Sequence, residues 1–252
     1  YLRTNTLKIT REKLKEEFAK EDIQTEFVPD FDDCLVLPER KNVFTTQCFK
    51  KGYFEVQDAS SQLIAPLLGV QPGQRVVDAC AGAGGKTLHM AAMMKNKGKI
   101  IAMDIHEWKL AELKKRAARD GVDIIETKVI ESTKTFKRLE ANFDRVLLDV
   151  PCSGLGVLRR NPDTKWKLSQ DEIVRLIDLQ KSILTDYSRM CKPNGFMVYA
   201  TCSILNSENE DQVKWFLGTE AGQNWNLVKE IRMWPHKEGH DGFYGALLQR
   251  KP

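Results

Sequence analysis

An alternation of short apolar runs with longer amphipathic stretches, beginning near residue 72, constrains the fold of this 252-residue chain more than any other feature. Such alternation is typical of parallel strands joined by crossover helices. The predicted strands are 75–79, 99–104, 123–129, 143–150 and 196–202, and the predicted helices are 86–96, 107–121, 171–190 and 207–218. Segments 226–234 and 243–250 are expected to close the sheet as an antiparallel pair. The predicted fold class is therefore α/β, with a mostly parallel Rossmann-like sheet that binds ligands beyond the carboxyl ends of its strands.

The first 70 residues follow a different pattern, which is typical of a small α+β module. REKLKEEFAKE, at 11–21, predicts one amphipathic helix. Strand-like segments lie at 2–9, 25–29, 34–38 and 43–49. DASSQLIAPLLG, at 58–69, predicts a helix that leads into the main sheet. We therefore expect an N-terminal module with its connecting helix at 1–70 and the main domain at 71–252.

A glycine-rich loop, DACAGAGGKT at 78–87, follows the first strand of the main domain. A phosphate-binding P-loop needs a glycine at position 80 to turn the backbone around the phosphates, and residue 80 is Cys. The dinucleotide-binding pattern G-x-G-x-x-G fails at Thr87. Asp104 ends the next strand, where a carboxylate can accept hydrogen bonds from a ribose diol. These features favour a nucleoside cofactor without phosphates, of which S-adenosylmethionine is the commonest; ATP binding stays an open alternative.

Composition excludes several classes of protein. The chain is 42% apolar and 29% charged, which is ordinary for a globular protein, and no apolar stretch approaches the roughly 20 residues of a membrane-spanning helix. A net charge of +4 is too mild to indicate nucleic-acid binding by itself. The six cysteines form no C-x-x-C pair, so we expect free thiols, no metal site and a cytoplasmic location. The chain starts at Tyr1, which leaves a preceding segment, such as a removed signal peptide, open.

Two of the cysteines follow neighbouring strands at the same predicted edge of the sheet. Cys152 lies in the loop PCSGLG, and Cys202 ends the strand 196–202. A loop so rich in glycine and polar residues is not typical of core packing, so we predict a functional role for this pair. The cysteines expected to be buried structural residues are Cys34, Cys48 and Cys191.

A series of motifs covers nearly the whole chain: LRTNTLK, VQDASSQL, DACAGAGGKT, AMDIHEWKL, RVLLDVPCSGLG, RRNPDTKW, YATCSILNSENE and HDGFYGALL. Together they resemble the Fmu/Sun, or RsmB-like, family of RNA 5-methylcytosine methyltransferases. The pairing of DVPCSG with TCS is specific, because most methyltransferases contain neither. The resemblance implies a class I methyltransferase sheet that binds S-adenosylmethionine, behind a small N-terminal RNA-binding module.

The resemblance also implies roles for individual residues. Cys202 would be the nucleophile and Cys152 would assist product release, with Asp149 and Lys86 beside them. The expected cofactor-binding residues are Cys80, Ala81, Gly82, Ala83, Gly84, Gly85, Lys86, Asp104, Lys109, Glu131 and Asp149. Two of these positions depart from the family pattern. Lys109 stands where many relatives have Arg, and Glu131 stands where relatives usually place an Asp near the adenine.

A cysteine nucleophile suits this chemistry because carbon 5 of cytosine is not nucleophilic enough to take a methyl group directly. Addition of a thiolate at carbon 6 converts the ring into an enamine that is. We expect Lys86 to favour the Cys202 thiolate and Asp149 to hydrogen-bond the ring nitrogen and exocyclic amine. The base must leave its stack to react, which favours single-stranded or looped RNA.

The expected partner is RNA, with ribosomal RNA as the default and transfer RNA open. Predicted RNA contacts near the site are Arg159, Arg160, Lys165 and Trp166. A DNA cytosine methyltransferase would use Cys152 as the nucleophile, but the chain lacks a large target-recognition insertion. A non-catalytic RNA-binding or ribosome-assembly factor with a vestigial cofactor site stays open.

Overall fold

A computed structural model describes residues 1–132 and 134–252 of the chain. Its larger sheet has seven strands in the order β10-β11-β9-β8-β5-β6-β7. The strands are β5 (Arg75–Asp78), β6 (Lys99–Asp104), β7 (Ile125–Val129), β8 (Phe143–Asp149), β9 (Cys191–Thr201), β10 (Trp225–Met233) and β11 (Phe243–Arg250). Neighbours from β9 to β7 pair in parallel, whereas β11 runs antiparallel to both β9 and β10. The predicted mostly parallel α/β sheet with an antiparallel last strand is confirmed.

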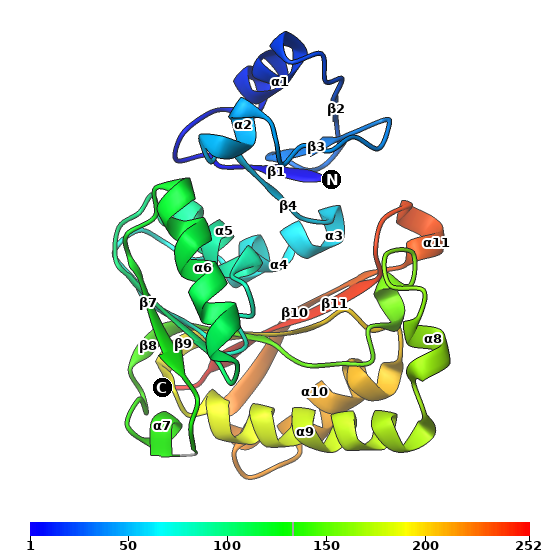
Figure 1. Ribbon diagram of the computed structural model, residues 1–252. Helices are drawn as coiled ribbons and strands as arrows, with labels where there is room; N and C mark the ends of the chain where they lie inside the picture. Colours follow the sequence, from blue (N-terminus) through cyan, green and yellow to red (C-terminus); the bar gives the residue numbers. More distant parts are fainter. Residues whose placement is uncertain (133) are drawn as a thin grey trace.

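Helices cover both faces of this sheet (Figure 1). They are α3 (Ala59–Gln62), α4 (Ile64–Leu68), α5 (Gly85–Met93), α6 (Glu107–Asp120), α7 (Lys134–Lys137), α8 (Thr164–Lys167), α9 (Gln170–Ser188), α10 (Glu210–Leu217) and α11 (Pro235–Glu238), with 3-10 turns η1 (Leu155–Val157), η2 (Asn206–Glu208) and η3 (Gly222–Asn224). Val146 and Leu148 of β8 pack in one buried cluster, and Leu147 packs in the other. This alternation follows from the two-residue period of a strand. Both faces of β8 are therefore buried, as its continuous apolar run requires.

The long helix α9 begins where its sequence signal predicts, but its end differs from the expectation. The Ser169 hydroxyl accepts a hydrogen bond from the Glu172 N–H (3.2 Å), which caps the helix. The predicted helix ends at residue 190 and the predicted strand begins at 196, but the segment between them, 191–195, lies within β9. Its pairing with β8 shifts register between Phe143 and Arg145, so the extra residues bulge out of the ladder.

The N-terminal module has a four-stranded sheet of order β2-β3-β1-β4, which Figure 1 shows above the main sheet. Its elements are β1 (Leu2–Thr4), α1 (Arg11–Lys20), β2 (Glu26–Phe27), β3 (Cys34–Val36), α2 (Gln47–Lys50) and β4 (Phe54–Val56). The prediction of a strand at 43–49 is wrong, because the Thr46 hydroxyl accepts from the Phe49 N–H (3.0 Å) and starts α2. The strand of this region is β4 instead.

The connecting segment packs with the main sheet. The expected helix at 58–69 is divided at Leu63 into α3 and α4. Ile64, Ala65 and Leu68 belong to the buried cluster that also contains Leu147 of β8. The module has its own core around Leu14, Phe18 and Phe54; a division of the chain at residue 70 stays a prediction. Within the described residues, no helix is long and apolar enough to cross a membrane.

Candidate active site

The carboxyl ends of β5, β6, β8 and β9 carry the predicted site residues. The loop after β5 turns sharply, because Gly82 and Gly84 have φ of +53° and +91°, a region that favours glycine. A Cβ on Gly84 would lie 2.5 Å from the Leu113 side chain. At Gly82, a Cβ would meet no atom of the described residues within 4 Å, so this face of the loop is open.

Asp104, the last residue of β6, is joined to the glycine loop. Its carboxylate accepts hydrogen bonds from the backbone N–H groups of Gly82 (2.9 Å) and His106 (2.8 Å). Ile105 follows, with 63% of its surface exposed. The strand end thus combines a carboxylate that retains unused lone pairs with an exposed apolar side chain.

Two other residues expected to bind the cofactor lie on α6 and beyond β7. Lys109, in the first turn of α6, places its ammonium 5.7 Å from the ring centroid of Trp108. Glu131 is exposed beyond the end of β7. Within the described residues, neither side chain hydrogen-bonds to the glycine loop or to Asp104. Cys80 lies half-buried in the loop, and burial raises the pKa of its thiol.

Lys86 and Asp149 form an ion pair across the site, with Nζ and Oδ2 2.6 Å apart. The Lys86 ammonium also lies 4.9 Å from the centroid of the Phe243 ring. Beneath it, Asp78 accepts a hydrogen bond from the Thr87 hydroxyl (2.7 Å), and burial raises the pKa of Asp78 to about 7. Asp78 opens the motif DACAGAGGKT and is not among the site residues predicted from the sequence.

The structure brings the thiols of Cys152 and Cys202 together, with their sulfur atoms 3.4 Å apart. Each cysteine follows one of the parallel neighbours β8 and β9, so their loops emerge side by side. The Gly156 N–H donates to the Cys202 carbonyl (2.9 Å). A Cβ at position 156 would lie 2.7 Å from that oxygen and 2.3 Å from the Gly242 carbonyl. Glycine is therefore required for the two loops to approach this closely.

The two thiols have opposite pKa shifts. The hydrogen bond from Cys152 lowers the pKa of Cys202, and Lys86 and Arg160 act in the same direction, against burial and the Asp149 charge. The same hydrogen bond, together with burial, raises the pKa of Cys152. Cys202 is accordingly the thiol of the pair that ionises more readily.

A hollow of about 490 Å³ opens beside Cys152, against α8 and the start of α9. Its lining residues are Cys152, Ser153, Thr164, Lys167, Leu168, Ser169, Glu172 and Leu176. Trp166 is 80% exposed, with the Lys165 ammonium 4.6 Å from its ring centroid. Arg160 pairs with Asp241 (2.6 Å), and Arg159 donates to the Gly239 carbonyl (2.6 Å). The two arginines are therefore anchored to the loop before β11, whereas Trp166 faces solvent.

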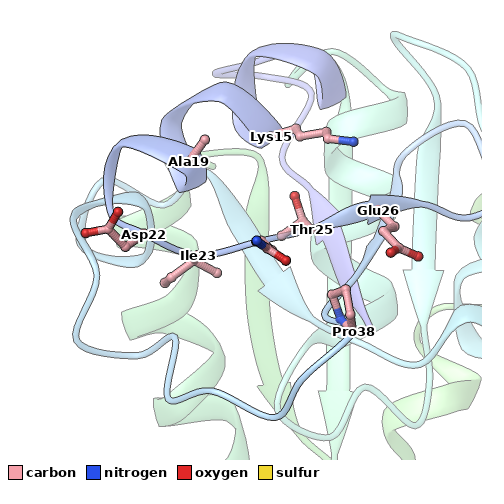
Figure 2. A pocket seen from close by; sticks show the side chains of 8 residues that line it. Lys15, Ala19, Asp22, Ile23, Thr25, Glu26 and Pro38 are labelled. Carbon is pink, nitrogen blue, oxygen red and sulfur yellow. The ribbon is translucent and has the colours of Figure 1, made fainter.

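A larger hollow, of about 670 Å³, lies in the N-terminal module (Figure 2). Its lining residues are Lys15, Ala19, Asp22, Ile23, Gln24, Thr25, Glu26 and Pro38. They come from α1 and the segments that follow it, and include none of the predicted site residues. Among the described residues, no cluster of three or more His, Cys, Asp or Glu side chains could hold a metal ion.

A seven-stranded sheet with one antiparallel strand, a glycine loop after β5 and an acid at the end of β6 defines the α/β methyltransferase fold. Residues 65–249 match the family described as 16S rRNA methyltransferase RsmB/F, and the chain belongs to this family. The resemblance inferred from its motifs is thereby confirmed.

Individual relatives agree with this membership. A protein of Bacillus subtilis named probable ribosomal RNA small subunit methyltransferase B is 34% identical over 99% of the chain and 59% of its own length. A crystal structure of a methyltransferase homologue from Pyrococcus horikoshii is 29% identical, with a TM-score of 0.84 over 99% of the chain and 85% of its own. NSun6 from P. horikoshii, solved with SFG, shares the fold at 22% identity, with a TM-score of 0.90 over 100% of the chain and 90% of its own. The chain spans about three fifths of the length of the curated relatives it matches.

Proposed function

We propose that the protein transfers a methyl group from S-adenosylmethionine to carbon 5 of a cytosine in RNA, through a covalent bond between Cys202 and the base. The observation that carries the proposal is the 3.4 Å separation of the Cys152 and Cys202 sulfur atoms, beside the Lys86–Asp149 ion pair. Family membership favours small-subunit ribosomal RNA as the substrate.

The residues at the end of β6 fit an adenosine-containing cofactor. The Asp104 carboxylate keeps acceptor capacity for a ribose diol, exposed Ile105 offers apolar surface to the adenine, and the open face at Gly82 lets a ligand approach the backbone. Bound S-adenosylmethionine would supply an electrophilic methyl group. A loop that binds a nucleoside triphosphate would need a glycine at position 80, where this chain has Cys.

In this proposal, Cys202 is the nucleophile and Cys152 is the base that acts after methyl transfer. The Cys202 thiolate adds to carbon 6, and carbon 5 then carries the electron density that attacks the methyl group. The Asp149 carboxylate accepts a hydrogen bond from the exocyclic amine, and the Lys86 ammonium beside it offsets the negative charge that builds on the ring.

Cys152 acts after methyl transfer. Once Cys202 is bonded to carbon, the negative charge that opposed ionisation of Cys152 is gone, so Cys152 can lose its proton to solvent. Its thiolate then takes the proton from carbon 5, and the electron pair of that C–H bond restores the ring double bond as the carbon–sulfur bond breaks. The product is the methylated cytosine, with the Cys202 thiolate regenerated and Cys152 protonated.

Trapping of the covalent intermediate tests these assignments. Cys152→Ala incubated with S-adenosylmethionine and RNA should accumulate a protein–RNA adduct on a denaturing gel, because the adduct forms but cannot resolve. Cys202→Ala should form none, and Cys48→Ala, which alters a buried thiol in the N-terminal module, should behave like the wild type. The reverse pattern for the first two variants would make Cys152 the nucleophile.

The RNA target is identified by a separate measurement. Exposed Trp166 and Lys165, beside the hollow at Cys152, support a single-stranded or looped substrate whose bases can stack. Bisulfite sequencing of total RNA from cells with and without the protein should show one cytosine of small-subunit ribosomal RNA that loses its protection when the protein is absent. Loss of protection in transfer RNA instead would reassign the substrate.

A further inference from the structure

Glu208 is a fully buried carboxylate beneath the cysteine pair, in the 3-10 turn η2. Its Oε1 accepts hydrogen bonds from the Ser153 N–H (2.8 Å) and from the Gln180 side-chain amide (3.0 Å). Its Oε2 accepts from the hydroxyls of Ser153 and Ser203 (2.5 Å each). This one side chain therefore receives four hydrogen bonds, from the loop after β8, the loop after β9 and α9.

The donors are the immediate neighbours of the two cysteines. Ser153 follows Cys152 and Ser203 follows Cys202 in the chain, and their hydroxyl oxygens lie 3.1 Å apart. Gln180 also donates to the carbonyl of Pro151, which precedes Cys152 (3.0 Å). Glu208 thus binds the residue after Cys152 through its backbone and hydroxyl, the residue after Cys202 through its hydroxyl, and the residue before Cys152 by way of Gln180.

The turn that carries Glu208 is itself held in place. The Tyr199 hydroxyl donates to the Glu208 carbonyl (2.6 Å). The next residue, Asn209, donates to the Ser203 carbonyl (3.0 Å) and accepts from the Thr201 hydroxyl (2.5 Å). Hydrogen bonds from Glu208 and Asn209 therefore reach residues on both sides of Cys202.

Stability alone gives little reason for an acid at this position. Burying a carboxylate carries a desolvation penalty of several kcal/mol, and well-packed apolar residues often replace buried polar groups without loss of stability. What a carboxylate provides is two acceptor atoms of fixed separation that can each take two donors. Three of the four donors lie on the two loops that carry the cysteines, and the distance between these loops sets the distance between the thiols.

We propose that Glu208 is a positioning residue that sets the distance between the Cys152 and Cys202 thiols by joining the residues that follow each of them. The catalytic consequence rests on the function proposed above, whereas the effect on thiol spacing does not. Glu208→Ala removes all four acceptor contacts and lets the loops separate. Glu208→Gln keeps one acceptor oxygen for the two N–H donors, and its amide can donate to the two hydroxyls.

Disulfide formation between the two thiols reports their spacing without RNA or cofactor. Glutathione disulfide oxidises the pair by two exchange steps, in which two protein thiols become one disulfide and two glutathione molecules are released. Peptide mapping of the full chain at intervals gives the rate for Cys152–Cys202. We expect Glu208→Ala to slow this rate by about tenfold or more, because a displacement near 1 Å can reduce rates strongly, and Glu208→Gln to stay close to the wild type.

Matched variants make the result decisive. Asp211→Ala removes an exposed acid on α10 and should leave the rate unchanged. Ser203→Ala removes one donor to Glu208, together with the acceptor of the Leu205 N–H (3.0 Å), and should slow disulfide formation less than Glu208→Ala does. If Glu208→Ala fails to fold in a thermal unfolding assay, Ser203→Ala decides the question. A folded Glu208→Ala protein, or Ser203→Ala if that variant is needed, with the wild-type rate would overturn the proposal. A slowed rate in Glu208→Ala, together with no RNA adduct in Cys152→Ala, would refute the proposed function and leave the positioning role intact.

Discussion

The six cysteines of the chain differ in burial and in hydrogen-bond partners. Burial raises the pKa of Cys34 to about 11 and that of Cys48 and Cys191 to about 12, so these thiols stay protonated in neutral solution. A donor aimed at the sulfur and a cation nearby favour the anion where they outweigh burial. At Cys34 burial outweighs the hydrogen bond from Gln62. Among the described residues, Cys202 has both, from Cys152 and from Lys86.

Alkylation of the thiols as a function of pH tests this difference. The pKa of Cys202 lies below its ordinary value of 9.0, so near pH 7.5 iodoacetamide should modify Cys202 before Cys152. The rate should rise with pH and level off above the Cys202 pKa, because the thiolate is the reacting form. The charged groups that face the pair are Lys86, Arg160, Asp149 and Glu208.

Removing the donor should move that profile. Cys152→Ala deletes the hydrogen bond that stabilises the Cys202 thiolate, so the alkylation curve of Cys202 should shift to higher pH. Mass spectrometry of the digested protein measures both sites in one sample. Faster labelling of Cys152 than of Cys202 in the wild type would show that the negative charge sits on the other sulfur.

At the scale of elements, the N-terminal sheet holds the glycine loop of the main domain. Glu55 of β4 pairs with Arg116 of α6 (2.6 Å), and Arg116 donates to the carbonyl of Ala83 (2.7 Å). Arg3 of β1 donates to the carbonyl of Gly85 (2.5 Å). The carbonyls of Ala83 and Gly85 are thus each bound by an arginine, one from α6 and one from the N-terminal sheet.

Cofactor affinity should therefore depend on a residue that does not touch the cofactor. Arg116→Met removes the hydrogen bond to Ala83 and should weaken binding of S-adenosylhomocysteine by about tenfold, or about 1.4 kcal/mol, as measured by titration calorimetry. Lys115→Met, which alters an exposed neighbour on the same helix, serves as the control. Equal dissociation constants for both variants and the wild type would show that the loop keeps its shape without this contact.

At the scale of the whole molecule, one short basic segment with an exposed tryptophan lies beside the site. The net charge is only +4, yet Arg159, Arg160, Lys165 and Lys167 lie within one short segment next to the hollow at Cys152. A local basic segment suits contact with a phosphate backbone, and exposed Trp166 suits stacking on a base.

The dependence of RNA affinity on salt separates these two contributions. For single-stranded RNA the slope of log affinity against log salt concentration changes by about 0.7 for each phosphate contact, so Lys165→Gln should reduce the slope by about that amount. Trp166→Ala should lower affinity by about 1–3 kcal/mol at every salt concentration and leave the slope unchanged. Lys214→Gln on α10 is the control. A Lys165→Gln slope equal to that of the wild type would place the phosphate contacts elsewhere.

The sequence predicted the main sheet well, because its signals are local. Strand β8 is a continuous apolar run, and the Ser169 capping box of α9 lies within four residues. The N-terminal module was harder, since its strands are two or three residues long and carry little periodicity. The apolar pattern at 43–49 resembled a strand, and a single capping hydroxyl at Thr46 made it the start of a helix instead.

By itself, the sequence determined the α/β fold, the strand ends at which polar residues gather and the family to which the chain belongs. These follow from periodicity and short motifs, which are properties of neighbouring residues. Only the tertiary structure decided that two sulfur atoms lie 3.4 Å apart, that Glu208 lies beneath them and that β1 and β4 reach the glycine loop. Such contacts join residues that are as many as 82 positions apart, and their geometry depends on how whole elements pack.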